Sequence, residues 1–250
     1  MPDVRLERRE GVALITLAAP QRRNAFTPPM VAELLAICDQ VDADPEIGAA
    51  VIRGEGESFC SGAHRDILKA AGEDPMHPDR YATIGGSYEA FFRVGHLKVA
   101  TVAAVRGHAV GAGVNLMLAT DLRVVAEDAR IITGFARIGI HPGGGHFALL
   151  GRLAGREATA AMSVFGQEIS GRRAVELGLA WEARPAEEVE ERAYELAAEA
   201  ARDPELSRQT VRSFRLELGP PELPWSAALE TERAVQAWSL RRREVRGWPS

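Results

Sequence analysis

The stretch GHAVGAGVNLMLATD, residues 107–121, is the part of this sequence that is most informative about the fold. It follows the apolar run VATVAAV (99–105), which is typical of a buried strand, and it passes from a glycine-rich turn into an apolar helix. Such a turn directs free backbone N–H groups and the positive end of a helix dipole toward one point. That point suits an anion, either a fixed phosphate or an oxyanion that forms only during a reaction.

A second turn of small residues lies upstream. The strand AAVIRG (49–54) is followed by ESFCSGAHRD (57–66), whose turn can expose the N–H of Ala63. Two N–H donors from two such turns can form an oxyanion hole, which binds the negative charge that develops on a carbonyl oxygen. The alternative is that Gly62, Gly111 and Gly113 are simply turn glycines that adopt positive φ.

The composition is that of an ordinary globular protein. Of its 250 residues, 46% are hydrophobic and 26% are charged. A net charge of −5 argues against nucleic-acid binding, which needs a basic face. The N-terminus MPDVRLERRE has no apolar core of a signal peptide, and no apolar run reaches ~18 residues. We therefore expect a cytoplasmic protein without a membrane partner, and no residues have the spacing of a metal site.

Strand and helix patterns alternate along the chain, which predicts an α/β fold with right-handed crossovers and a mostly parallel sheet. Thr27 is expected to cap a helix that ends at Asp44-Pro45. Strands are expected at 3–9, 11–18, 48–53, 99–105, 121–126 and 130–133, and further helices at 79–94, 155–165, 170–178, 186–203 and 226–243.

Five motifs occur in a fixed order: PQRRNAF (20–26), FCSGAH (59–64), VAAVRGHAVGAG (102–113), FARIGIHPGGG (135–145) and GQEISGRRAVELGLAWE (166–182). Together they resemble the crotonase (enoyl-CoA hydratase/isomerase) superfamily, from about residue 4 to about residue 240. The resemblance implies a crotonase-like ββα superhelix over residues 1–203. It implies a C-terminal helical subdomain over 204–250 that packs on the core or on a neighbouring subunit. It also implies an acyl-CoA substrate, in which coenzyme A enters as part of the substrate, no tightly bound cofactor, and a homotrimer or dimer of trimers.

In family terms, the oxyanion hole would consist of the N–H groups of Ala63 and Ala112. They would polarise a thioester carbonyl and stabilise an enolate-like intermediate. Hydratases of the family also carry two glutamates, and the matching positions here hold Asn115 and Phe135. Asparagine can hold a water molecule but cannot take its proton, and phenylalanine can do neither. The sequence therefore departs from the family where the proton-transfer groups belong.

The missing carboxylates decide between reactions. Each positioned proton-transfer group contributes about 10²–10⁴-fold to a rate, whereas each oxyanion donor contributes roughly 10²–10³-fold. We expect a thioester to be bound and polarised, and ordinary two-glutamate hydration to be poor. Isomerisation, decarboxylation, thioester hydrolysis and carbon–carbon cleavage remain open, as does a non-catalytic acyl-CoA binding protein. A dinucleotide site near residue 111 is disfavoured, because no G-x-G-x-x-G is completed there.

Asn115 is expected to face the acyl pocket, although it could instead be a polar residue inside the helix. Phe135 is either a core residue or a pocket wall that favours a bulky or planar acyl group. Three histidines fall within the motifs and could carry protons in place of the carboxylates, or could be solvated or buried: His64, His141 and His146. Besides His64 and Phe135, the expected pocket includes Gly111, Gly113 and Gly144.

Coenzyme A contacts are expected along the segment from Arg22 to Ala25 and at the turn near residue 61. Only two lysines occur in the chain, so phosphate recognition falls mainly to arginine. Cys60 beside this turn could be a nucleophile, but a buried thiol is favoured because the sequence places no base next to it. The residues expected to contact the coenzyme are Arg22, Arg23, Ala25, Ser61, Ala63 and Arg65.

Overall fold

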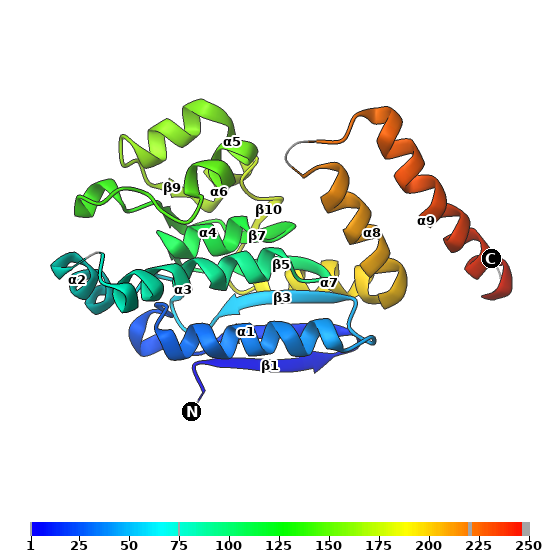
Figure 1. The fold of residues 1–250 in the computed structure, drawn as a ribbon, viewed down its shortest axis with the longest axis horizontal. Helices are drawn as coiled ribbons and strands as arrows, with labels where there is room; N and C mark the ends of the chain where they lie inside the picture. Colours follow the sequence, from blue (N-terminus) through cyan, green and yellow to red (C-terminus); the bar gives the residue numbers. More distant parts are fainter. Residues whose placement is uncertain (1, 75, 220–221, 247–250) are drawn as a thin grey trace.

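A six-stranded sheet runs through the centre of the protein (Figure 1). The computed structural model describes residues 2–74, 76–219 and 222–246. The first two strands pair antiparallel, and the other neighbours pair parallel. In sheet order, the strands are β1 (Val4–Arg9), β2 (Val12–Leu17), β3 (Ala49–Gly54), β5 (Ala100–Val105), β7 (Leu122–Ala126) and β10 (Glu182–Arg184).

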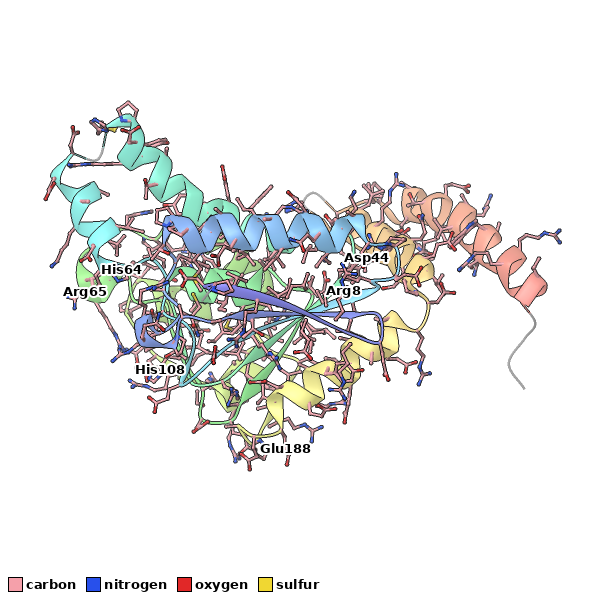
Figure 2. All side chains as sticks on the ribbon, turned by 90° about the horizontal axis from the view of Figure 1, so that it is seen from below. Arg8, Asp44, His64, Arg65, His108 and Glu188 are labelled. Carbon is pink, nitrogen blue, oxygen red and sulfur yellow. The ribbon has the colours of Figure 1, made fainter. Side chains whose placement is uncertain are left out.

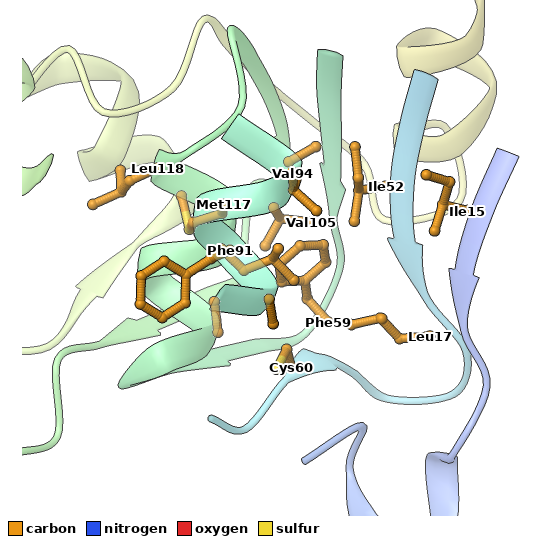
Figure 3. Close-up of a cluster of buried hydrophobic side chains, with 14 of the residues drawn as sticks. Ile15, Leu17, Ile52, Phe59, Cys60, Phe91, Val94, Val105, Met117 and Leu118 are labelled. Atoms are coloured by element: carbon orange, nitrogen blue, oxygen red, sulfur yellow. The ribbon is translucent and has the colours of Figure 1, made fainter. Parts of the chain in front are cut away.

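Both faces of the central strands β2, β3, β5 and β7 are covered, which explains why these four strands are mainly apolar. In β2, Ile15 and Leu17 point to one core, whereas Val12 and Leu14 point to the other. The first core contains α1 (Pro28–Ala43), α3 (Pro78–Gly95) and α4 (Ala112–Leu118) (Figure 3). The second is closed by α7 (Val189–Ala201). The expected α/β class with a mostly parallel sheet and C-terminal helices is confirmed.

A second, smaller sheet was not predicted by the sequence. Its strands are β4 (Ser58–Cys60), β6 (His108–Val110), β8 (Arg130–Ile132) and β9 (Ile169–Ser170), in that order. Of these, only β8 matches a strand expected from the sequence, at 130–133. The other strands have two or three residues, which is too short to show an alternating pattern. The two glycine turns, which contain Gly62 and Gly111, therefore follow β4 and β6 and do not follow β3 and β5 directly.

The remaining helices surround these sheets. They are α2 (Arg65–Glu73), α5 (His146–Ser163) and α6 (Gly171–Glu176). Two 3-10 turns also occur, η1 (Pro20–Arg22) between β2 and α1 and η2 (Ala136–Ile138) between β8 and α5. Thr27 caps α1 as expected, by accepting a hydrogen bond from the N–H of Met30. Gly155 interrupts α5 with φ of 74°, at the point where a helix was expected to start.

Two helices form the C-terminal region, α8 (Pro204–Glu217) and α9 (Trp225–Arg246). Arg208 fixes α8 to the core by donating to four carbonyl oxygens at the end of α1 and in the following turn. Arg215 and Asp121 form an ion pair of 2.6 Å, and Asp121 also accepts from Thr101, so this aspartate has a structural role. Helix α9 contacts α8 and extends away from the sheet (Figure 1). No helix of the described residues is long and apolar enough to cross a membrane.

Candidate active site

The two glycine turns meet because β4 and β6 are parallel neighbours, so their carboxyl ends lie at the same edge of the small sheet. Gly62 and Gly111 have φ values of 84° and 55°, which favour glycine. A Cβ on Gly62 would lie 2.7 Å from the carbonyl oxygen of Val110 and 3.1 Å from the nitrogen of Ala112. Only glycine at position 62 therefore allows the turns to pack this closely.

The N–H groups of Ala63 and Ala112 flank this contact. The Ala63 turn is held against Phe26, whose N–H donates to the carbonyl of Gly62 and whose carbonyl accepts from the N–H of His64. Ala112 begins α4, so its N–H has no partner within the helix. In the described parts of the chain, no hydrogen bond uses either N–H group. Both donors are thus free for a bound molecule.

A pocket of about 600 Å³ opens beside the two turns. Its lining contains Ala63 and Ala112 together with Asn115, Phe135 and His141. The walls are mainly apolar, and the polar groups are few. Further lining comes from Ser61, Gly62, Arg65, Ile67, Leu68, Lys69, Ser87, Tyr88, Val110, Gly111, Ile132, Thr133, Gly134, Arg137, Ile138, Ile140 and Gly143. Among the residues that the structure describes, no aspartate or glutamate lines this pocket.

Asn115 lines the pocket and is 1% exposed. Its Nδ2 donates to the carbonyl oxygen of Gly143 at 3.1 Å. Its Oδ1 lies 2.7 Å from Nδ1 of His146, and Nε2 of His146 lies 3.1 Å from the hydroxyl of Ser163. The amide is therefore held from two sides, by the carbonyl of Gly143 and by the buried ring of His146.

His146 is buried behind Asn115 and does not line the pocket. Burial lowers the pKa of His146 to about 4, because the imidazolium would lose its hydration. The ring is therefore neutral at physiological pH, and both nitrogens already have partners. His146 therefore has no free nitrogen that faces the pocket, so its position does not suit the role of proton carrier that the sequence suggested for it.

Phe135 precedes η2 and is half-buried, with its ring on the pocket wall. The ring meets that of His146 edge to face, with centroids 5.0 Å apart and planes inclined by 63°. Of the two alternatives for Phe135, the structure therefore favours the pocket wall.

The other two histidines differ in position. His141 lines the pocket, and its Nδ1 lies 2.6 Å from the carbonyl oxygen of Pro142. Because a carbonyl oxygen only accepts, Nδ1 carries the proton and Nε2 of the neutral ring keeps a free lone pair. His64 caps α2, accepting from the N–H of Asp66, and it lies outside the lining. Only His141 of the three is thus placed to act on a molecule in the pocket.

The expected coenzyme contacts are divided between two places. Ser61 and Arg65 line the pocket mouth together with Lys69, which the sequence analysis did not single out. Figure 2 shows His64 and Arg65 close together near one end of the molecule. Arg22, Arg23 and Ala25 do not line the pocket.

The Arg22 segment has mainly structural contacts. Arg22 forms an ion pair with Asp3, and Ala25 is buried. Arg23 is exposed with φ of 52°, and its carbonyl accepts from the N–H of Ser61. This segment therefore supports the turn at residue 61 from behind.

Three further residues of the turns serve packing. A Cβ on Gly113 would lie 2.1 Å from the carbonyl oxygen of Cys60, and one on Gly144 would lie 2.4 Å from the ring of Phe91. Both glycines lie outside the pocket lining. Cys60 is fully buried, and burial raises the pKa of its thiol to about 12, so the buried-thiol interpretation is favoured.

Sequence reasoning missed Ser163 and the lining residues of α2 and α3. Ser163 ends α5, far in sequence from Asn115, and no local pattern connects the two. Lys69 and Tyr88 lie on helices whose approach to the pocket depends on tertiary packing.

Comparison with known proteins identifies the family. The model of the family "Enoyl-CoA hydratase/isomerase" matches residues 7–237. A probable enoyl-CoA hydratase of Mycobacterium tuberculosis is 38% identical over 92% of this chain and 86% of its own length. The 1,2-epoxyphenylacetyl-CoA isomerase of Escherichia coli K12 is 32% identical over 78% of this chain and 74% of its own length. A crystal structure of an enoyl-CoA hydratase from Polaromonas sp. JS666 superimposes with a TM-score of 0.85 at 27% identity, covering 95% of this chain and 91% of that one. The chain belongs to the enoyl-CoA hydratase/isomerase family and has the crotonase fold.

Proposed function

We propose that this protein is an enzyme that binds an acyl-CoA thioester with its carbonyl oxygen between the N–H groups of Ala63 and Ala112. The two donors stabilise the enolate-like intermediate that forms when the α-carbon loses a proton or carbon dioxide. The free N–H groups at the contact between the Gly62 and Gly111 turns support this placement.

These free N–H groups carry the proposal, and the choice of reaction rests on the absence of carboxylates from the pocket lining of the described residues. Hydration requires one group to activate water and one to protonate the α-carbon, and Asn115 and Phe135 provide neither. We therefore favour isomerisation or another reaction of an enolate over two-carboxylate hydration. The name of the Escherichia coli relative, an acyl-CoA isomerase, agrees with this direction.

His141 is the pocket group that we assign to proton transfer. Its Nε2 keeps a free lone pair in the neutral ring, since Nδ1 donates to the carbonyl of Pro142. Arg65 and Lys69 at the mouth are suited to the phosphates of the coenzyme. Within this proposal, coenzyme A enters as part of the substrate.

A second candidate is a non-catalytic acyl-CoA binding protein, which the absence of carboxylates also favours. A turnover screen separates the two. The protein is incubated with enoyl-, 3-hydroxyacyl-, malonyl-type and aryl-acetyl-CoA thioesters, and products are measured by mass spectrometry. Turnover of any thioester that is lost in Ala63→Pro but kept in Ala63→Gly supports the enzyme. Binding of thioesters without turnover supports the second candidate, and no binding contradicts both.

The expected homotrimer or dimer of trimers is also proposed here. Helix α9 presents Trp225, Leu229 and Leu240 as exposed apolar side chains, which a neighbouring subunit could cover. Light scattering coupled to gel filtration measures the mass. A monomer at micromolar concentration contradicts this part of the proposal without affecting the site.

A further inference from the structure

The orientation of the Asn115 amide is fixed by its surroundings. The carbonyl oxygen of Gly143 can only accept a hydrogen bond, so the amide atom that faces it at 3.1 Å must be Nδ2. Oδ1 then faces Nδ1 of His146 at 2.7 Å and accepts its proton. Reversing the amide would bring two carbonyl oxygens together and leave the ring without an acceptor.

His146 keeps this orientation because its own hydrogen bonds are fixed. Nδ1 donates to Asn115, so Nε2 of the neutral ring accepts from the hydroxyl of Ser163 at 3.1 Å. His146 and Ser163 are 1% and 4% exposed. Burial lowers the pKa of His146, so one neutral tautomer persists at physiological pH.

The amide nitrogen has a second N–H that these contacts do not use. In the parts of the chain that the structure describes, no protein acceptor is recorded for it, and the open space that Asn115 borders is the pocket. Asn115 lies three residues after Ala112 on α4, and both residues line the same pocket. A molecule in this pocket can therefore meet the Asn115 amide and the N–H of Ala112.

We propose that Asn115 determines substrate specificity by donating this second N–H to an oxygen atom on the β-carbon of the acyl group. The preferred substrates are then acyl-CoA thioesters with a carbonyl or hydroxyl oxygen at that carbon. His146 is a positioning residue, which holds the donor toward the pocket. This inference rests on the proposed function, because the thioester oxygen must lie between Ala63 and Ala112.

The β-carbon is the position within reach. With the thioester oxygen at the N–H of Ala112, the α- and β-carbons are the next atoms along the acyl group. The side chains of Phe135 and Ile138, which line the same pocket, are apolar and provide no acceptor for the amide. A buried donor without a partner is unfavourable, so an oxygen on the ligand is selected over a methylene group.

The test compares two thioesters of equal chain length, butyryl-CoA and acetoacetyl-CoA, which differ in the β-oxygen. Their dissociation constants are measured by titration calorimetry. The natural protein is expected to bind acetoacetyl-CoA about fivefold more tightly, the effect of one added hydrogen bond. Asn115→Leu should bring the ratio to about one, and Asn115→Asp should reverse it, because a carboxylate repels the β-oxygen. Ser87→Ala removes a different buried hydroxyl from the same lining and should leave the ratio unchanged.

The positioning role is tested on the same ratio. His146→Leu removes the donor to Oδ1 and should reduce the preference to below about twofold, whereas His146→Gln restores a donor and should keep most of it. Circular dichroism identifies variants that have not folded. A purely structural role of His146 would lower stability in both variants and leave the ratio of the folded protein unchanged, which would overturn the positioning role.

The outcomes separate this inference from the proposed function. If neither thioester binds to the natural protein, the proposed function fails. If both bind equally, the specificity inference fails and the proposed function stands. If Ser87→Ala abolishes the preference and Asn115→Leu keeps it, the assignment to Asn115 is overturned.

Discussion

Oδ1 of Asn115 accepts a 2.7 Å hydrogen bond from Nδ1 of His146, in a buried contact between α4 and the first residue of α5. By the family resemblance, Asn115 matches a position at which hydratases carry a glutamate. A glutamate would ionise and exchange a proton, whereas the amide is neutral and is held by a neutral ring. We propose that the pair provides a fixed hydrogen-bonding group in place of a proton carrier.

The natural protein should hydrate crotonyl-CoA poorly. Two proton-transfer groups, each worth about 10²–10⁴-fold, are missing. The double variant Asn115→Glu, Phe135→Glu should gain hydration, measured as loss of the conjugated thioester absorbance. Each single variant should gain little, because the effects on the rate of two groups that act together are far from additive. Efficient hydration by the natural protein would contradict the assignment of positions 115 and 135.

Stability should depend on pH through His146. The pKa is about 4 in the folded protein against 6.5 in the unfolded chain, so between these values the unfolded state binds more protons. The free energy of unfolding should therefore fall by roughly 1.4 kcal/mol for each pH unit below 6.5. The total loss should reach about 3 kcal/mol near pH 4.

The variant His146→Gln isolates this effect, because glutamine does not titrate and the other groups are unchanged. Urea unfolding at pH 7, 5.5 and 4.5 should show a smaller loss of stability in the variant than in the natural protein. Parallel losses in the two proteins would show that His146 is not buried in a neutral form.

His141→Gln should reduce any turnover found by about 10²–10⁴-fold, because the variant loses the free lone pair at Nε2. Added imidazole should restore part of the activity, since it can diffuse to the exposed position of residue 141. His64→Gln is the control, because His64 caps α2 outside the pocket lining. Unchanged turnover in His141→Gln would exclude this histidine as the proton carrier.

Ala63→Pro should lower turnover by roughly 10²–10³-fold, because it removes one donor of the oxyanion hole. The hydrogen bonds that hold this turn to Phe26 use other atoms, namely the carbonyl of Gly62 and the N–H of His64. Ala63→Gly keeps the N–H and should stay within a few-fold of the natural protein. A folded Ala63→Pro protein with full turnover would place the thioester elsewhere.

Much of the fold could be predicted because long elements carry strong patterns. The apolar runs of β3, β5 and β7 and the Thr27 cap of α1 are local signals, and each lies where it was expected. The small sheet could not be predicted, since strands such as Ser58–Cys60 are too short to show a period. Its pairing is nevertheless what brings the two glycine turns together.

The site was predictable where backbone geometry determines it and less so where side chains meet across the fold. Ala63, Ala112, Asn115 and Phe135 share one pocket, as the motif positions suggested. The burial of His146 could not be read from its sequence neighbours, because it depends on α4 in front and on Ser163 at the far end of α5. The glycines that precede His146 in the sequence show no pattern that would indicate whether its side chain is buried.

The central claim is that the N–H groups of Ala63 and Ala112 polarise a thioester carbonyl. Isotope-edited infrared spectroscopy measures this directly, with butyryl-CoA carrying ¹³C at the carbonyl. Binding to the natural protein and to Ala63→Gly should shift the carbonyl stretch to lower frequency, and binding to Ala63→Pro should produce a clearly smaller shift. A bound thioester whose carbonyl frequency equals that in water, or an equal shift in folded Ala63→Pro, would contradict the account.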